Sequence, residues 1–254
     1  MFLEMKILAI ETSTMLGGIA IVDDLSGLIA EVRLNVKSTH SERLVTATDY
    51  VLKQAGLKVS DIDVFAVAIG PGSFTGLRIG LSTVKGFSYS TGLPIVSVPT
   101  LEALAWNFPY CRPPVCTMLD ARKKEVYAAL FKWDKKNFIR LMDEVSIKMD
   151  AVLEKIREIL TVSNKMPIFG KEEAGGFLDE KIIFTGEGAI LYRDKIIEVM
   201  GEKAIFASFE KMVPSPANVA RLGIEKAKKG DFSEPVSLIP FYKRRSEAEI
   251  KGDA

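Results

Sequence analysis

The sequence has little of the residue types on which many catalytic and structural sites depend. Of its 254 residues, only two are cysteine and only one, His40, is histidine. Cys111 and Cys116 lack the second pair of cysteine or histidine ligands that a zinc site needs, so we expect free thiols. One histidine cannot supply a two-histidine metal site, and it leaves His40 as the sole candidate imidazole base.

Long hydrophobic runs are also missing. No apolar stretch reaches the roughly 18 residues that a membrane span requires. The first ten residues mix acidic and basic side chains with strand-forming ones, unlike the apolar centre of a secretion signal. We therefore expect a cytoplasmic protein without membrane contact.

Neither sign of charge is in clear excess, because 34 lysine and arginine residues are balanced by 33 aspartate and glutamate residues. A protein that binds nucleic acid by general neutralisation of phosphates usually carries a basic excess. Any RNA contact must therefore be local or shared with a partner. The remaining composition, 48% apolar and 26% charged, is that of an ordinary globular protein large enough to bury a core.

Short apolar runs and turn signals predict two rounds of strands followed by helices, typical of an α/β layer structure. The first round has predicted strands at 6–11, 18–22, 28–34, 64–69 and 95–98, and helices at 40–55 and 75–90. The second has predicted strands at 115–119, 126–133, 138–147 and 182–184, and helices at 151–160 and 190–200. A last helix is expected from Ser215, a cap, to the stop at Gly230.

Three prolines between residues 106 and 114 predict a hinge or a domain crossing. We therefore expect an N-terminal α/β domain at 1–105 that carries partner-binding helices, and a second α/β domain at 106–214. Residues 215–254 are expected to form a C-terminal helix and tail that pack back on the first domain.

A glycine-rich segment, Gly70 to Gly80, lies between a predicted strand and a predicted helix. It is neither a Walker phosphate loop nor a dinucleotide fingerprint, because the required lysine and third glycine are missing. A tight turn and a binding role both remain open. Gly76, Gly80 and Thr83 recur on one helix face, and each glycine destabilises a helix by about 1 kcal/mol. Close approach of another helix would offset this, so a bulky residue at Gly80 is expected to abolish pairing while the monomer stays folded.

Acidic and hydroxyl side chains follow the first strand of each round. Glu11, Thr12 and Ser13 follow the first strand, and Asp120 with Arg122 holds the corresponding place in the second round. Actin-like phosphotransfer folds use such residues to contact magnesium and phosphate, whereas the simpler alternative is a capped turn. His40 is either a capping or interface residue or a base. The cluster at 243–245 is either a phosphate contact or a solvated tail.

Six segments occur in an order that resembles one known family. They are MKILAIETST at 5–14, HSERL at 40–44, GPGSFTGLRIG at 70–80, LEALA at 101–105, DARKKEVY at 120–127 and PFYKRR at 240–245. Together they resemble the bacterial TsaB family, also called YeaZ. The resemblance implies an actin-like, Hsp70-like (ASKHA) duplicated fold of two α/β domains, each with a mixed central sheet flanked by helices. It also implies a role in forming N6-threonylcarbamoyladenosine at position 37 of tRNAs that read ANN codons.

In that family TsaB is a non-catalytic scaffold that pairs with its catalytic paralogue TsaD, and both bind the ATPase TsaE. TsaD carries a His-x-x-x-His metal motif, which a chain with one histidine cannot supply. The resemblance implies that tRNA is bound through the complex and that the protein alone forms homodimers. The implied interface residues are His40, Leu44, Thr48, Val51, Gly76, Gly80, Thr83 and Phe87.

We expect no catalytic residue, no metal and no cofactor of its own, although ATP or ADP could bind the complex or a degenerate cleft. The cleft residues are Glu11, Thr12, Ser13, Asp120, Arg122, Gly186 and Gly188. The alternative is an independent actin-like ATPase or phosphotransferase that uses Glu11, Thr12 and Asp120. A metallopeptidase is disfavoured because the ligands are missing. Residues 164–180 form a polar segment to which the resemblance assigns no role.

Overall fold

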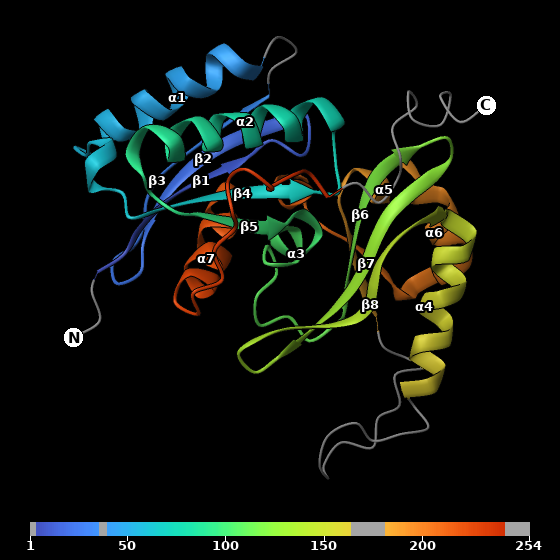
Figure 1. Ribbon diagram of the computed structural model, residues 1–254. Coiled ribbons are helices and arrows are strands. Elements are labelled where there is room, and N and C mark those ends of the chain that lie inside the picture. Colours follow the sequence, from blue (N-terminus) through green and yellow to red (C-terminus); the bar gives the residue numbers. More distant parts are fainter. Residues whose placement is uncertain (1–3, 36–39, 164–180, 242–254) are drawn as a thin grey trace. The chain divides into compact units, whose positions relative to one another are not determined.

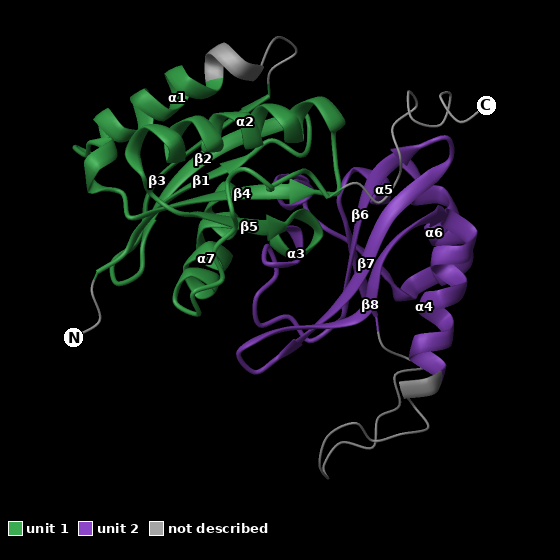
Figure 2. Ribbon diagram, viewed as in Figure 1, with its two compact units in different colours: residues 1–103, 214–242 green, residues 104–213, 243–254 purple. Residues whose placement is uncertain are grey.

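The computed structural model describes residues 4–35, 40–163 and 181–241 (Figure 1). The chain divides into two compact units (Figure 2). The first unit takes its described residues from 1–103 and 214–242, and the second takes them from 104–213. The expected domain boundaries, after residues 105 and 214, lie within two residues of these divisions. The polar segment 164–180 and the basic cluster 243–245 lie outside the described residues.

The first unit is built on a mixed five-stranded sheet with the order β3-β2-β1-β4-β5. Its strands are β1 (Lys6–Glu11), β2 (Leu16–Asp23), β3 (Gly27–Asn35), β4 (Val64–Gly70) and β5 (Ile95–Pro99). The first three form an antiparallel meander, and β4 and β5 run parallel to β1. β1 and β4 lie in the middle and are almost wholly buried, which explains their continuous apolar sequences.

Helices cover both faces of this sheet (Figure 1). They are α1 (His40–Gln54), α2 (Phe74–Thr91) and α7 (Pro216–Ala227), with the short α3 (Thr100–Ala105) following β5. Side chains alternate between the faces of a strand, so Leu8 shares a core cluster with Leu44 and Val51 of α1. Its neighbour Ile7 points to the other face, where Gly223 lets α7 approach closely.

The second unit repeats this topology. Its sheet has the order β8-β7-β6-β9-β10, in which three antiparallel strands are followed by two that run parallel to the first of them. The strands are β6 (Val115–Arg122), β7 (Glu125–Asp134), β8 (Asn137–Lys148), β9 (Ile182–Thr185) and β10 (Ala204–Phe206). The predicted duplicated α/β architecture is therefore confirmed.

The helices of the second unit are α4 (Met149–Ser163), α5 (Glu187–Leu191) and α6 (Arg193–Met200). They share a core with β6, β7 and β9, in which Phe184 and Ile156 are fully buried. Three details differ from the sequence prediction. The single helix expected at 190–200 is two helices that meet at Tyr192, and α3 and β10 were not expected. Both unexpected elements are shorter than the windows in which periodicity can be recognised.

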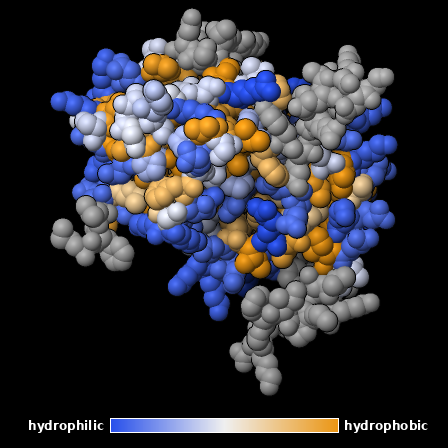
Figure 3. Space-filling model, in the orientation of Figure 1, coloured by the Kyte–Doolittle hydropathy of each residue, from blue (hydrophilic) through white to orange (hydrophobic). Residues whose placement is uncertain are grey.

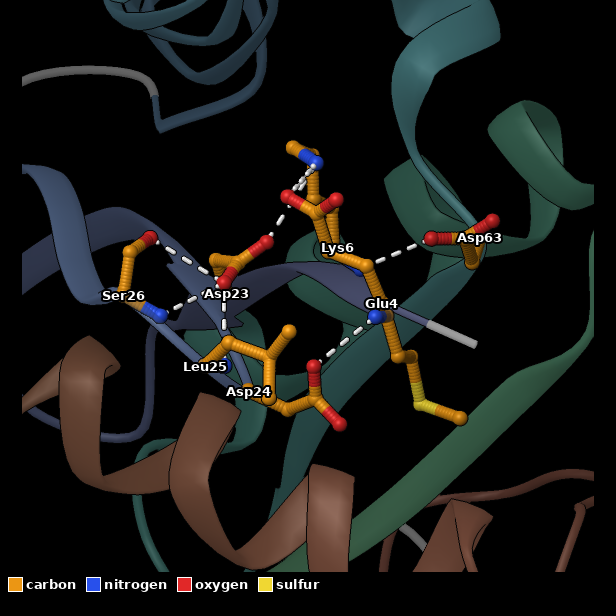
Figure 4. Close-up of polar contacts among 8 residues, drawn as sticks. Glu4, Lys6, Asp23, Asp24, Leu25, Ser26 and Asp63 are labelled. Atoms are coloured by element: carbon orange, nitrogen blue, oxygen red, sulfur yellow. Dashed lines mark hydrogen bonds and ion pairs between the residues drawn. The ribbon is translucent and has the colours of Figure 1, made fainter. Parts of the chain in front are cut away.

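A polar cluster fixes the turn between β2 and β3 (Figure 4). Asp23 accepts hydrogen bonds from the amide and the hydroxyl of Ser26 at 2.7 and 3.0 Å, and its Oδ2 lies 3.3 Å from Lys6 Nζ. Asp24 Oδ2 lies 2.8 Å from Lys228 Nζ, just after α7. The bonds from Ser26 lower the pKa of Asp23, and Lys228 lowers the pKa of Asp24. Both aspartates thus remain ionised while tying α7 and β1 to this turn.

Within the described part of the chain, no helix combines the length and the apolar character needed to cross a membrane. On the face of the molecule shown in Figure 3, hydrophobic residues occur in small groups among hydrophilic ones. Scattered apolar residues of this kind are normal on protein surfaces. A group of exposed hydrophobic residues is therefore not by itself evidence of a binding site.

The separate core of the second unit gives a first prediction. Phe184→Ala should lower the free energy of unfolding by about 3–5 kcal/mol, because the lost ring leaves a cavity in a fully buried site. Hydrogen exchange followed by mass spectrometry should show faster exchange in β6 and β9. The control Phe209→Ala, at a side chain that is 87% exposed, should leave exchange unchanged. Unchanged protection of β6 and β9 in Phe184→Ala would contradict the assigned core.

Candidate functional site

The glycine-rich segment lies directly on the loop that follows β1. A Cβ atom at Gly72 would overlap the carbonyl oxygen of Ser13, and one at Gly76 would overlap that of Thr12. A Cβ atom at Gly80 would overlap the Thr12 hydroxyl. The glycines are thus required because the backbone of α2 and the loop approach each other more closely than any side chain allows.

Hydrogen bonds close the same contact. Thr12 Oγ1 donates to the carbonyl of Gly76 at 2.8 Å, and the amide of Ser73 donates to the carbonyl of Ser13 at 2.7 Å. Ser73 also caps α2, because its hydroxyl accepts a hydrogen bond from the amide of Gly76 at 3.3 Å. The start of α2 and the loop after β1 therefore form one rigid element.

Glu11, the last residue of β1, has a fully buried carboxyl group. Its Oε1 accepts hydrogen bonds from the amide and the hydroxyl of Ser13, both at 2.5 Å. Among the described residues, Oε2 has no hydrogen-bond partner. Desolvation raises the pKa of Glu11 to about 7, against the opposing effect of the two bonds from Ser13. Burial therefore favours the neutral, protonated form of this carboxyl group, and Oε2 is the oxygen available for the proton.

The loop from Glu11 to Thr14 consequently faces inward. All four of its side chains are buried, and its hydroxyl groups bond to the chain itself. A group that contacts magnesium or phosphate must present free oxygens to the ligand. In this conformation the hydroxyl groups of Thr12 and Ser13 bond within the chain, and the unpaired Oε2 of Glu11 is buried among the described residues rather than presented to solvent.

The remaining predicted cleft residues lie in the second unit, at the end of β6 and in the turn after β9. Asp120 accepts a hydrogen bond from the amide of Arg122 at 2.8 Å and pairs with its guanidinium group at 3.0 Å. Gly186 has a φ of 102°, and a Cβ atom there would overlap the carbonyl oxygen of Met118. Gly188 also packs on Met118. These two glycines thus let α5 approach β6.

The two units use glycine in the same place. In each, a strand parallel to the first strand of the sheet is followed by a glycine-containing turn and a helix, as β4 is followed by α2 and β9 by α5. In each, the glycines pack on the first strand or the loop directly after it. The duplication therefore extends from sheet order to backbone packing, although the two segments share no recognisable sequence repeat.

Most predicted interface residues point into the first unit. Leu44, Thr48 and Val51 of α1 are buried, as are Gly76 and Gly80 of α2, whereas Thr83 and Phe87 are half-buried. The side chain of His40 lies outside the described residues. A bulky residue at Gly80 would overlap the Thr12 hydroxyl, so it would disturb the packing of the first unit itself as well as any partner surface; that the monomer stays folded remains a prediction.

Sequence reasoning missed the apolar side chains that α1 and α2 expose. They are Val45 and Tyr50 on α1 and Phe74 and Tyr89 on α2, the last being 95% exposed. The available signal in the sequence was the presence of large apolar residues outside the helix faces that carry the predicted interface residues. A partner that binds α1 and α2 would meet these residues rather than the buried ones.

The repeated sheet order and the repeated glycine turns define the class of protein: it has the duplicated actin-like, Hsp70-like (ASKHA) fold. Solved structures share this fold, among them two from Pseudomonas aeruginosa. YeaZ from Pseudomonas aeruginosa has a TM-score of 0.70 at 20% identity and covers 94% of this chain and 99% of its own. An uncharacterized protein with similarity to peptidase YEAZ from Pseudomonas aeruginosa has a TM-score of 0.72 at 22% identity, covering 94% and 100%.

Sequence comparison gives the family. The family model TsaD, tRNA N6-adenosine threonylcarbamoyltransferase, matches residues 28–251. The tRNA threonylcarbamoyladenosine biosynthesis protein TsaB of Bacillus subtilis is 30% identical over 247 residues, which are 97% of this chain and 97% of that protein. TsaB of Escherichia coli is 31% identical over 159 residues, which are 61% of this chain and 68% of that protein. This chain belongs to the TsaB (YeaZ) family.

The glycine contact gives a second prediction. Gly76→Ala should lower the free energy of unfolding by about 1–3 kcal/mol, because its methyl group overlaps the Thr12 backbone. Gly86→Ala is the matched control in the same helix, since nothing lies within 4 Å of its Cβ position. That variant should raise stability by about 0.5–1 kcal/mol. Urea unfolding measures both values, and equal effects of the two variants would refute the close contact.

The buried carboxyl group gives a third prediction. The pKa of Glu11 rises from 4.5 to about 7 on folding, so the native state binds the proton more tightly than the unfolded state. The stability contributed by this proton is fully present below about pH 4.5 and is lost as the pH rises through 7, by about 3 kcal/mol. Urea unfolding between pH 5 and 8 should show this decrease, and Glu11→Gln should abolish it. A decrease of equal size in Glu11→Gln would assign the pH dependence to other groups.

Proposed function

We propose that this chain takes part in forming N6-threonylcarbamoyladenosine in tRNA, as the non-catalytic scaffold subunit of the modifying complex. The observation that carries the first part is the match to Bacillus subtilis TsaB over 97% of both chains. That protein is named for tRNA threonylcarbamoyladenosine biosynthesis. The length of the match makes a shared role for the whole chain the best-supported function.

The inward-facing loop after β1 supports the non-catalytic part of the proposal. Glu11, Thr12 and Ser13 hold the position at which related folds contact phosphate, but here their side chains are buried and bonded within the chain. The sequence also has one histidine, so it cannot supply a two-histidine metal site. The chain therefore contributes surfaces, and a paralogue of the TsaD type supplies the reacting groups.

The proposed partners are TsaD, the ATPase TsaE and, through their complex, tRNA. The surface proposed for TsaD, and for a homodimer when the chain is alone, is the outer side of α1 and α2. Exposed apolar side chains support this choice, because Val45, Tyr50 and Tyr89 offer area that a partner can remove from water. ATP or ADP is proposed to act at the complex rather than as a cofactor of this chain.

A reconstitution tests the function. Purified TsaD and TsaE with ATP, unmodified tRNA and threonylcarbamoyl adenylate should yield the modified nucleoside only when this chain is added, and the chain alone should yield none. Mass spectrometry of digested tRNA measures the product. Glu11→Gln should retain full product formation because the carboxyl group takes no part in the chemistry. ATP hydrolysis by the isolated chain, lost in Asp120→Ala, would instead support the alternative ATPase.

Charge on the outer side of α1 tests the surface. The double variant Val45→Asp/Tyr50→Asp should lose co-purification with TsaD, because a docked interface would bury two unpaired carboxylates. Phe209→Asp, at an equally apolar but more exposed side chain of the second unit, is the control and should retain it. Circular dichroism checks that all variants remain folded. Retained binding by the double variant would refute the assigned surface.

A further inference from the structure

One surface feature of the second unit lies outside the proposed partner surface and the predicted cleft. It is the end of the long hairpin formed by β7 and β8 (Figure 1), together with the segment that follows α3. Five aromatic rings gather there, and they include both tryptophans of the sequence. We call them the aromatic cluster; its members are Trp106, Tyr110, Phe131, Trp133 and Phe138.

Trp133 lies at the centre of the aromatic cluster. Its ring centroid is 5.2 Å from that of Trp106, 5.1 Å from that of Phe138 and 5.0 Å from that of Tyr110. The three contacts have interplanar angles of 89°, 80° and 62°, which is the favourable edge-to-face arrangement. Trp106 is buried and anchors the group. The cluster is therefore a fixed platform rather than a set of independent surface rings.

Tyr110 forms the outer member of this platform. Its contact with Trp133 holds the ring in place, yet 76% of the side chain remains exposed. A ring that is both fixed and open loses little side-chain entropy when a planar ligand stacks on it. Such a ring suits the face of a nucleic acid base, because base stacking on aromatic side chains is tolerant of sequence.

Positive charge lies on the same hairpin. Residues 131–140 read FKWDKKNFIR and contain four basic residues and one acidic residue, in a protein whose net charge is only +1. Lys135 and Lys136 occupy the turn itself and are exposed. No ion pair or side-chain hydrogen bond of either lysine is present within the described residues. The ammonium groups of these two lysines are thus available to bind an anion, and they follow Trp133 closely along the chain.

We propose that the aromatic cluster and the lysines of the β7–β8 turn form a binding site for single-stranded RNA, with a base stacked on Tyr110 and phosphates at Lys135 and Lys136. Charge complementarity selects RNA over a protein partner, because apolar protein interfaces are depleted in lysine whereas phosphate binding needs it. Because the chain has a net charge of only +1, any contact with RNA must be local, and this site is local. It deepens the proposed function, on which its biological role rests, by giving this subunit a direct contact with tRNA.

The test uses the intact protein and a fluorescein-labelled, 15-nucleotide single-stranded RNA of mixed sequence. Binding is followed by anisotropy and by intrinsic tryptophan fluorescence. Because both tryptophans belong to the aromatic cluster, quenching of their emission by the same RNA without its label reports binding at or near this site. The wild-type chain should bind the RNA at low salt with quenching of its emission. Binding without quenching, or no binding, would overturn the proposal.

Two sets of variants locate the contacts. Tyr110→Ala should weaken binding by about 5- to 100-fold, and Tyr110→Phe, which keeps the ring, should restore it. Lys135→Asn/Lys136→Gln should reduce the slope of log affinity against log salt by about 1.4, because two phosphate contacts to a single strand are lost. Asparagine is chosen at Lys135 because that residue has a φ of 49°.

A matched control removes two lysines elsewhere in the same unit. Lys124→Asn/Lys155→Gln loses the same charge, and Lys124 also has a positive φ, 63°, in the turn at the other end of β7. This variant should bind RNA like the wild type. Equal losses in both double variants would show a general charge effect and overturn the site. Unchanged RNA affinity in Tyr110→Ala, with weakened capture of TsaD, would assign the platform to a protein instead.

The modification assay separates this proposal from the proposed function. If Tyr110→Ala loses RNA binding but supports full tRNA modification at saturating tRNA, the site contributes to RNA affinity only. That result supports both the site and the proposed function. If the wild-type chain binds RNA here but never supports modification, the proposed function fails and the site does not. If modification is supported while RNA does not bind this chain, the site alone fails.

Discussion

The first unit depends on one contact, the packing of the α2 glycines on the loop after β1. Because Gly72 and Gly76 lack a side chain, the backbone of α2 lies directly on Thr12 and Ser13 and hydrogen-bonds to them. This contact sets how α2 lies on the sheet, and α1 packs beside it. It also closes the loop, which leaves Glu11 buried with one oxygen unpaired. Desolvation of a carboxylate is unfavourable, and its raised pKa is the consequence.

In the second unit, other glycines allow a similar close approach of a helix, there to the first strand of the sheet. Gly186 and Gly188 let α5 approach β6 at Met118, and the order of the strands is the same as in the first unit. The two units thus share the close approach of a helix to the first strand of the sheet or the loop directly after it, but not the side chains found there. This is consistent with a protein whose proposed role rests on its surfaces. The exposed apolar side chains of α1 and α2 and the aromatic cluster of the second unit are two such surfaces, and they differ in chemistry. The first combines exposed apolar side chains with paired charges such as Lys53 and Asp49, whereas the second is aromatic and carries a local excess of basic residues.

Local signals in the sequence predicted the regular elements well. The apolar runs of β1 and β4 predicted central strands because both faces of a central strand are buried. Ser215 and Pro216 predicted the start of α7, where the Ser215 hydroxyl accepts a hydrogen bond from the amide of Ala217 at 3.1 Å. The three-residue β10 and the break at Tyr192 were missed. Both depend on packing against distant parts of the chain, which local periodicity does not encode.

The sequence by itself determined the family, the duplicated α/β fold and the absence of a two-histidine metal site, because these follow from motif order, apolar patterning and residue counts. It also located the glycine segment, but the physical meaning of that segment was decided by tertiary structure. Whether a small residue faces a partner or the chain's own loop depends on contacts across more than sixty residues, as between Thr12 and Gly76. The same holds for the aromatic cluster. Tyr110 and Trp133 are separated in sequence, and only the folded hairpin brings their rings to 5.0 Å.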